Sequence, residues 1–167
     1  LLIQGTGTGT VFSGWSKTAA ADALRIYGNY IVLRDFAVSD AGVGILLPSN
    51  RYVTMEGLLM VSNALGIRMQ SGADCAVVNS LFLYNTNNAV VLDSVNDALV
   101  ENNTFYVNIP ASVSVTTSVG SVLQNNIFGI TAAGAKAYGG SSNDVAFNVG
   151  IDYNVYYFEQ PGYIYDI

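Results

Sequence analysis

Short apolar runs recur along this chain at intervals of 22 or 23 residues. The segments YIVLRDFAV, YVTMEGLLM, CAVVNSLFL, DALVENNTFY and GSVLQNNIFG align on one apolar anchor each. The anchors are Leu33, Met55, Val78, Val100 and Leu123, and they are separated by 22, 23, 22 and 23 residues. Apolar and polar residues alternate around each anchor, which is the period of a β-strand with one buried face. The pattern therefore predicts stacked short strands.

Two further apolar series repeat in step with the anchors. One lies five residues later, at Val38, Met60, Leu83, Phe105 and Phe128. The other is a pair, at Leu24/Ile26, Ile45/Leu47, Ile67/Met69, Val90/Leu92 and Val113/Val115. Turn-forming pieces rich in Gly, Asn, Asp and Ser separate the series. Helical repeats need amphipathic runs of ten or more residues, and leucine-rich repeats need a fixed leucine spacing that is missing here. We therefore predict an all-β parallel solenoid of about six to seven coils, with 22–23 residues per coil.

Two adjacent asparagines interrupt the apolar run DALVENNTFYVN. Asn103 lies three residues after the anchor Val100, and Asn126 lies three residues after Leu123. In stacked coils these two amides would form a hydrogen-bonded ladder along the solenoid axis. The alignment puts Phe36, Leu58 and Leu81 in the same column of the earlier coils, so we expect a ladder of two rungs.

Composition and charge narrow the class of protein. The chain has 167 residues, a net charge of −6, and only six Lys and Arg residues. Nucleic-acid binding needs a concentrated basic surface, so that class is excluded. No apolar run reaches the roughly 18 residues that membrane insertion requires. The single cysteine, Cys75, cannot form an internal disulfide. Abundant Asn, Gly and Tyr with little Lys are typical of an extracellular or cell-surface β protein, and we expect a bacterial one.

The chain resembles the secreted right-handed parallel β-helix repeat proteins, which share the fold of pectate lyases. The segments that support this are LLIQGTGTGTVFSG, NYIVLRDFAVSD, VENNTFYVN, LQNNIFG and IDYNVYY. The resemblance implies a right-handed parallel β-helix over nearly the whole chain. It does not choose a function, because that fold includes lyases, hydrolases, epimerases, phage tailspikes and non-catalytic surface modules.

Catalytic groups of the kind this family uses are sparse. Its polysaccharide lyases combine a Ca²⁺-binding acidic cluster with an Arg or Lys base. Arg25 and Arg68 share a column, but they lie two coils apart with Leu46 between them. The chain has no histidine, so epimerase-type chemistry lacks its residue. We therefore assign no catalytic residue and lean against enzyme activity.

The candidate ligands for a Ca²⁺ site are Asp74, Asp97 and Asp93. Carboxylates near one turn, with neighbouring side-chain oxygens, suit a cation that takes six to eight oxygen ligands. The alternative is that Asp and Asn occupy these turns because their side chains hydrogen-bond to the local backbone. No other cofactor is expected.

One polar column follows the anchors by one residue. It comprises Arg34, Glu56, Asn79, Glu101 and Gln124, which alternation points outward. This column reads as a solvated polar ladder, and the alternative is a sugar-binding face.

The two ends of the chain supply candidate interfaces. We expect residues 1–150 to form the coils and residues 151–167 to form a Tyr-rich segment of the same domain, either a cap or an interface. Both ends look like cuts or processing sites within a longer gene product. The candidate interface residues are Leu1, Leu2, Ile3, Tyr153, Tyr156, Tyr157, Phe158, Tyr163 and Tyr165.

Two main functions remain open from the sequence, beside a third, a receptor-binding role like that of tailspikes, which would require a trimer. The first is a non-catalytic extracellular structural module that self-assembles into a filament, sheath or surface layer, or that forms part of a larger secreted protein. The second is a module that binds or cleaves an extracellular polysaccharide in the manner of a lyase. Self-association or neighbouring domains are the expected partners in the first case, and a glycan in the second.

Overall fold

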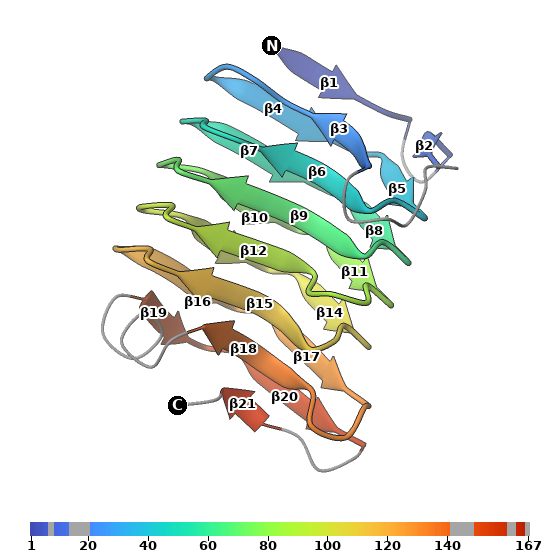
Figure 1. Ribbon diagram of the computed structural model, residues 1–167, viewed down its shortest axis with the longest axis vertical. Helices are drawn as coiled ribbons and strands as arrows, with labels where there is room; N and C mark the ends of the chain where they lie inside the picture. Colours follow the sequence, from blue (N-terminus) through green and yellow to red (C-terminus); the bar gives the residue numbers. More distant parts are fainter. Residues whose placement is uncertain (7–8, 14–20, 141–148, 160–162, 166–167) are drawn as a thin grey trace.

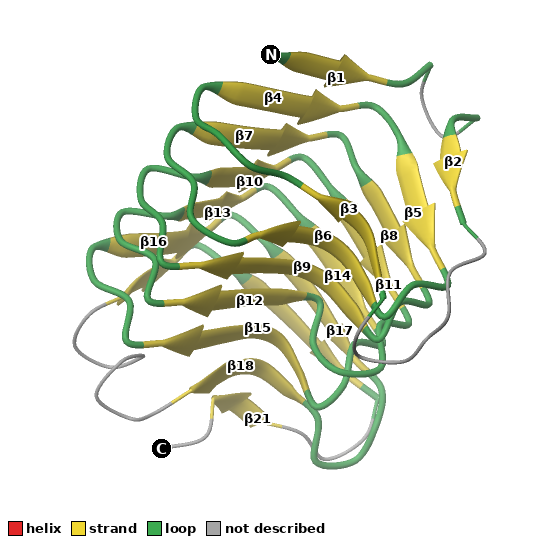
Figure 2. Cartoon of the chain, turned by 45° about the horizontal axis from the view of Figure 1, so that its top comes forward, coloured by secondary structure: helices red, strands yellow, loops and turns green. Residues whose placement is uncertain are grey.

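The computed structural model is a parallel β-helix whose wall consists of three sheets (Figures 1 and 2). It describes residues 1–6, 9–13, 21–140, 149–159 and 163–165. The chain passes through sheets A, B and C in turn and then returns to sheet A one strand further along. Every strand pair is parallel, as required when successive coils advance along one axis. No helix that could cross a membrane occurs in the described ranges.

Each sheet contains seven strands. Sheet A contains β1 (Leu2–Gln4), β4 (Ile31–Arg34), β7 (Val53–Glu56), β10 (Ala76–Val78), β13 (Leu99–Glu101), β16 (Ser121–Gln124) and β19 (Val149–Asp152). Sheet B contains β2 (Val11–Phe12), β5 (Ala37–Ser39), β8 (Leu59–Val61), β11 (Leu81–Leu83), β14 (Thr104–Tyr106), β17 (Ile127–Ile130) and β20 (Val155–Phe158). Sheet C contains β3 (Asp22–Arg25), β6 (Val43–Leu47), β9 (Leu65–Gln70), β12 (Val90–Asp93), β15 (Ala111–Thr116), β18 (Lys136–Gly140) and β21 (Tyr163–Tyr165).

The predicted right-handed all-β solenoid is confirmed, with a small difference in the number of coils. About five complete turns, from β4 to β18, lie wholly within described residues, slightly fewer than the six to seven expected. An outer strand of each sheet flanks these turns at either end. Residues 151–167 contribute β20 and β21, which pair with β17 and β18 and continue sheets B and C.

The strand register confirms four of the five predicted anchors and corrects the fifth. Leu33 pairs with Met55, and Val100 pairs with Leu123. Between them lies Val77, which pairs with both Met55 and Val100 and is fully buried. The prediction of Val78 was therefore wrong by one residue, because two adjacent valines fit strand alternation equally well. The same slip affects sheet B, where Phe82 rather than Leu83 pairs with Met60 and Phe105.

A residue with positive φ turns the chain from sheet A into sheet B on each coil. This column comprises Asp35, Gly57, Asn79, Asn102, Asn125 and Tyr153, with φ between 50° and 61°. Gly and Asn tolerate the left-handed conformation better than most residues, which explains their frequency here. Since each of these residues lies two places after its anchor, Asn79 identifies Val77 as the anchor of its coil. That signal was available in the sequence.

One continuous core fills the helix between the three sheets. Aromatic rings from sheet B stack along the axis: Phe82, Phe105 and Phe128 are 4.9 Å apart at each step, and Tyr156 follows at 5.5 Å. The predicted apolar pairs of sheet C are also confirmed in register, for example Ile45 with Ile67 and Val90 with Val113. The buried interior leaves the outer faces of the sheets as the places where function can reside.

Candidate functional site

Two arginines lie in one outward-facing column of sheet C. Arg25 on β3 pairs with Leu46 on β6, and Leu46 pairs with Arg68 on β9. The sequence prediction that these arginines share a column two coils apart is therefore confirmed. Two strand spacings separate them by roughly 10 Å. Both point outward because their strand neighbours Leu24 and Ile67 face the interior.

Each arginine is paired with an aspartate. An Arg25 terminal nitrogen lies 2.6 Å from Asp22 Oδ2, and Arg25 Nε donates to the same oxygen at 2.7 Å. An Arg68 terminal nitrogen lies 3.4 Å from Asp93 Oδ2 on the neighbouring strand. The side chains of Arg25 and Arg68 are still 50% and 38% exposed. Both side chains therefore remain partly open to solvent and to a ligand, although Arg68 Nε is itself buried.

Charge and hydrogen bonding keep Arg25 protonated. A hydrogen bond with the Tyr27 side chain, then the hydrogen bond and attraction from Asp22, raise the pKa of Arg25 above its usual value. An arginine with a raised pKa is a poor general base, since it does not release its proton near neutral pH. The column is better suited to holding an anion than to abstracting a proton. Paired guanidinium groups bind carboxylates through directed, charge-assisted hydrogen bonds.

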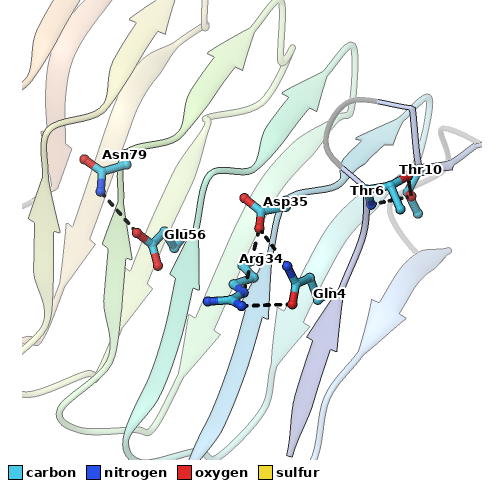
Figure 3. Close-up of polar contacts among 7 residues, drawn as sticks. All are labelled: Gln4, Thr6, Thr10, Arg34, Asp35, Glu56 and Asn79. Atoms are coloured by element: carbon cyan, nitrogen blue, oxygen red, sulfur yellow. Dashed lines mark hydrogen bonds and ion pairs between the residues drawn. The ribbon is translucent and has the colours of Figure 1, made fainter.

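A second polar surface follows the edge of sheet A next to sheet B (Figure 3). Arg34 donates to Gln4 Oε1 at 2.9 Å, and Gln4 Nε2 donates to Asp35 Oδ2 at 3.3 Å. Arg34 Nε also lies 3.7 Å from Asp35 Oδ2. On the next coils, Asn79 Nδ2 donates to Glu56 Oε1 at 3.4 Å. Figure 3 shows these side chains pointing toward one another along the strip.

The same strip continues toward the C-terminal coils. Gln124 Nε2 and Asn125 Nδ2 both donate to Glu101 Oε1, at 2.8 and 3.2 Å. The residue in register between Glu56 and Glu101 is Val78, so the expected placement of Asn79 in this column is corrected by the same one-residue slip. The carboxylates and amides of the strip and Arg34 hydrogen-bond to one another. We therefore interpret the strip as a polar ladder that stabilises the sheet edge.

The three candidate Ca²⁺ ligands do not converge. Asp93 lies at the end of β12 and pairs with Arg68. Asp74 and Asp97 lie in the turns from sheet C to sheet A of two adjacent coils, with φ of 54° and 53°. Across the described ranges, no three His, Cys, Asp or Glu side chains come close enough together to hold a metal ion. Asp74 and Asp97 instead occupy the left-handed turn positions that Asp tolerates.

The asparagines singled out in the sequence form part of a longer buried ladder. Asn103 Nδ2 donates to Asn126 Oδ1 at 3.1 Å, and Asn126 Nδ2 donates to Asn154 Oδ1 at 3.0 Å. Ser80 extends the column, since its backbone N–H donates to Asn103 Oδ1 at 2.9 Å. The slipped anchor had placed Leu81 where Ser80 lies, which hid this rung. These side chains hydrogen-bond to one another and to the backbone of neighbouring coils.

Sequence reasoning missed a second buried ladder at the turn from sheet B to sheet C. Asn63 Nδ2 donates to Asn85 Oδ1 at 3.2 Å, and Asn85 Nδ2 donates to Asn108 Oδ1 at 2.8 Å. All three side chains are buried. The signal was their spacing of 22 and 23 residues, which matches that of the anchors.

The candidate interface residues differ in exposure. Leu1, Tyr153 and Tyr157 are 77%, 76% and 57% exposed. Leu2 and Phe158 are also exposed, whereas Ile3 packs against the core. Tyr156 is partly buried, because its ring continues the Phe82–Phe105–Phe128 stack and its hydroxyl lies 3.0 Å from that of Tyr138. Tyr163 and Tyr165 belong to β21, but their side chains lie outside what the structure describes.

Comparisons with known proteins agree with this architecture. A search of curated proteins gave no match. Among solved structures, an alginate lyase from Paenibacillus sp. str. FPU-7 is similar with a TM-score of 0.60 and 14% identity, covering 98% of this chain and 82% of the lyase. At that identity the likeness establishes the fold alone. The family model described as "Right handed beta helix region" matches residues 3–150. The chain therefore belongs to the right-handed β-helix family.

Proposed function

We propose that this chain binds an acidic polysaccharide on the outer face of sheet C, as a module of the polysaccharide-lyase type. The observation that supports this most directly is the outward column containing Arg25 and Arg68, about 10 Å apart along the solenoid. A uronate polymer presents a carboxylate on each sugar, so an extended chain lying along the helix axis can meet both arginines. The spacing is comparable with the length of a disaccharide unit.

The chemistry of the column favours an anionic sugar over a neutral one. Guanidinium groups bind carboxylates with planar, charge-assisted geometry. The chain as a whole is anionic, so a polyanion would be repelled by most of its surface. Binding is therefore expected to depend on these two positions and not on a general electrostatic attraction. The alginate lyase with the similar fold makes alginate the first polymer to test.

Binding is a better fit to this face than cleavage. A lyase must neutralise the uronate carboxylate and also remove a proton from the adjacent carbon. The guanidinium of Arg25 suits the first task, whereas its raised pKa disfavours the second. Cleavage is therefore a separate question, and an assay for the unsaturated product answers it.

Affinity electrophoresis tests the binding proposal. Native gels are cast with alginate, with polygalacturonate, or with neutral dextran, and the retardation of the protein is compared. We expect retardation in the two uronate gels only. Replacing both Arg25→Gln and Arg68→Gln should weaken binding at least about tenfold, the loss expected when charge-assisted hydrogen bonds worth about 1.4 kcal/mol or more are removed.

The matched control is Arg51→Gln together with Arg34→Gln. These two arginines lie in the turn between sheets C and A and on sheet A, so this variant has the same net charge without touching the column. Equal weakening by both double variants would show that charge alone matters and would refute the site. No retardation of the wild-type protein by either uronate polymer would refute the function. Absorbance of the unsaturated product is followed in parallel with the same variants.

A further inference from the structure

Sheet B has an outer face without charge. None of the residues in the seven strands of sheet B is Asp, Glu, Lys or Arg. The inward positions are the stacked aromatic rings and the residues in line with them. The outward positions are Val11, Ala37, Ser39, Leu59, Val61, Leu81, Leu83, Thr104, Tyr106, Ile127, Gly129, Val155 and Tyr157. The charged residues Asp40 and Glu159 directly follow β5 and β20, so they lie at the edge of the face and not on it.

Several of these apolar side chains are in contact with solvent. Ile127, Val155 and Tyr157 are 49%, 61% and 57% exposed. The Tyr106 ring lies over Gly129, where an added Cβ would come within 2.5 Å of the ring. At the edge of the sheet, Tyr84 is half exposed and packs edge-on against Tyr106. Contiguous apolar surface of this kind marks a docking site more often than a solvated wall.

We propose that a second copy of this chain docks against the outer face of sheet B, side by side. Each copy has a net charge of −6, so two copies repel through most of their surfaces. An uncharged face is where identical anionic chains can approach with the least repulsion. Interfaces between identical subunits are also more apolar than other interfaces and poor in charged residues at their centre. This proposal places the self-association expected from the sequence on the outer face of sheet B.

A glycan fits this face less well than a protein does. Sugar hydroxyls need hydrogen-bond partners, and the outward strand positions offer only the hydroxyls of Ser39 and Thr104 and the phenols of Tyr106 and Tyr157. Most of the face is aliphatic. A second apolar sheet can cover this face without hydrogen bonds, because burial of apolar surface is itself favourable.

The size of the face indicates reversible association. Seven strands span about 29 Å and three residues span about 10 Å, or roughly 300 Å² in projection. Stable interfaces bury about 800 Å² per partner, so the turns beside the sheet must contribute and the affinity should be modest. We expect a monomer–dimer equilibrium in the micromolar range.

Sedimentation velocity of the full chain tests the proposal, from about 1 to about 500 μM. The mass should rise from 17.7 kDa toward twice that value as concentration increases. Ile127→Lys and Tyr157→Lys place a charge on β17 and β20, the last two strands of the face, and each should reduce dimerisation at least about tenfold. Both side chains are substantially exposed, and a thermal melt checks that each variant is folded. The control is Val119→Lys, a 55% exposed residue in the turn from sheet C to sheet A.

The outcomes separate clearly. Dimerisation that is lost in both sheet B variants and kept in Val119→Lys supports the proposal. A wild-type protein that stays monomeric over the whole range overturns it, as does dimerisation that persists in folded Ile127→Lys and Tyr157→Lys. Equal loss in the Val119→Lys control also overturns it. Co-sedimentation of monomer with phosphatidylcholine vesicles would identify a lipid surface as the occupant instead, and would likewise overturn it.

Discussion

At the scale of single residues, the conformation of each turn is imposed by the coil above and below it. Tyr30, Tyr52, Tyr84 and Val107 all have φ between 53° and 58°, a region that costs most L-residues about 1–2 kcal/mol. Their backbone N–H groups donate to the next coil, as when Val107 N–H donates to Gly129 O at 3.1 Å. The stacked hydrogen bonds therefore outweigh local preference. Asn102 satisfies both requirements, whereas Asn103 beside it is selected by the buried ladder.

The Asn63–Asn85–Asn108 ladder makes a direct prediction about stability. Asn85 accepts from the backbone N–H and Nδ2 of Asn63 and donates to Met60 O and Asn108 Oδ1. Asn85→Leu leaves several buried groups without partners, at about 1–3 kcal/mol each. We expect the free energy of unfolding to fall by about 3 kcal/mol or more, measured by urea denaturation.

Asn87→Leu is the matched control, because Asn87 lies two residues away and is exposed. Its effect should stay within about 0.5 kcal/mol. Equal effects of the two substitutions would contradict a structural role for the ladder.

At the scale of elements, the sheets are joined through buried contacts that differ along the axis. Near the C-terminal coils, Tyr138 of β18 packs against Phe128 of β17 and Tyr156 of β20. Burial, and then the hydrogen bond with Tyr156, raise the pKa of the Tyr138 phenol. Burial likewise raises the pKa of the Cys75 thiol, which lies in the core between β9 and β10. Both groups therefore favour their neutral forms in the folded protein.

The raised pKa values predict a loss of stability in alkali. Unfolded Cys and Tyr ionise near pH 8.5 and 10, whereas the folded protein keeps these two groups protonated to higher pH. Their contribution is fully present below those unfolded values and is lost as pH rises above them, by up to about 1.4 kcal/mol per pH unit for each group. Urea denaturation from pH 7 to pH 11 should show the slope, steepening above about pH 10.

Tyr138→Phe distinguishes the tyrosine from the cysteine. The variant should lose the steeper part of the slope above about pH 10 while keeping the Cys75 part above about pH 8.5. At neutral pH it should be destabilised only slightly, by about 1 kcal/mol, for the hydrogen bond to Tyr156. An unchanged slope above pH 10 would show that Tyr138 ionises alike in both states.

At the scale of the whole molecule, the three outer faces have different chemistry. Sheet C carries the two arginines, sheet A carries a polar strip whose members bind one another, and sheet B is uncharged. The three sheets keep these faces apart, because each sheet takes one strand from every coil and runs along the whole stack (Figure 2). Polysaccharide binding on sheet C and dimerisation through sheet B therefore need not compete.

This separation predicts that the two activities can be removed one at a time. Ile127→Lys should lose dimerisation and keep retardation in alginate gels, apart from any loss of avidity. The Arg25→Gln, Arg68→Gln variant should lose retardation and dimerise as the wild type does. Sedimentation velocity and affinity electrophoresis on both variants check this. Loss of both activities in either variant would show that the faces are coupled.

The sequence alone determined the fold class and most of the register of this protein. Repeated apolar anchors can only be buried together when the coils stack, so the period and the alternation sufficed for the solenoid. They also placed Arg25 and Arg68 in one column and Asn103 beside Asn126. What remained ambiguous was local: Val77 and Val78 satisfy alternation equally well, and the choice between them changed the partners of Ser80 and Phe82.

The tertiary structure decided which side chains have partners and which surfaces remain free. The sequence offered Asp93 as a candidate metal ligand, and the structure adds that it lies beside Arg68, because distances between coils do not follow from composition. The sequence offered Tyr156 as a candidate interface residue, and the structure adds that its ring continues a core stack. The uncharged outer face of sheet B also became visible only when the strands were assembled. A strand of three residues shows too little apolar surface for its face to be recognised, and seven of them side by side form a continuous one.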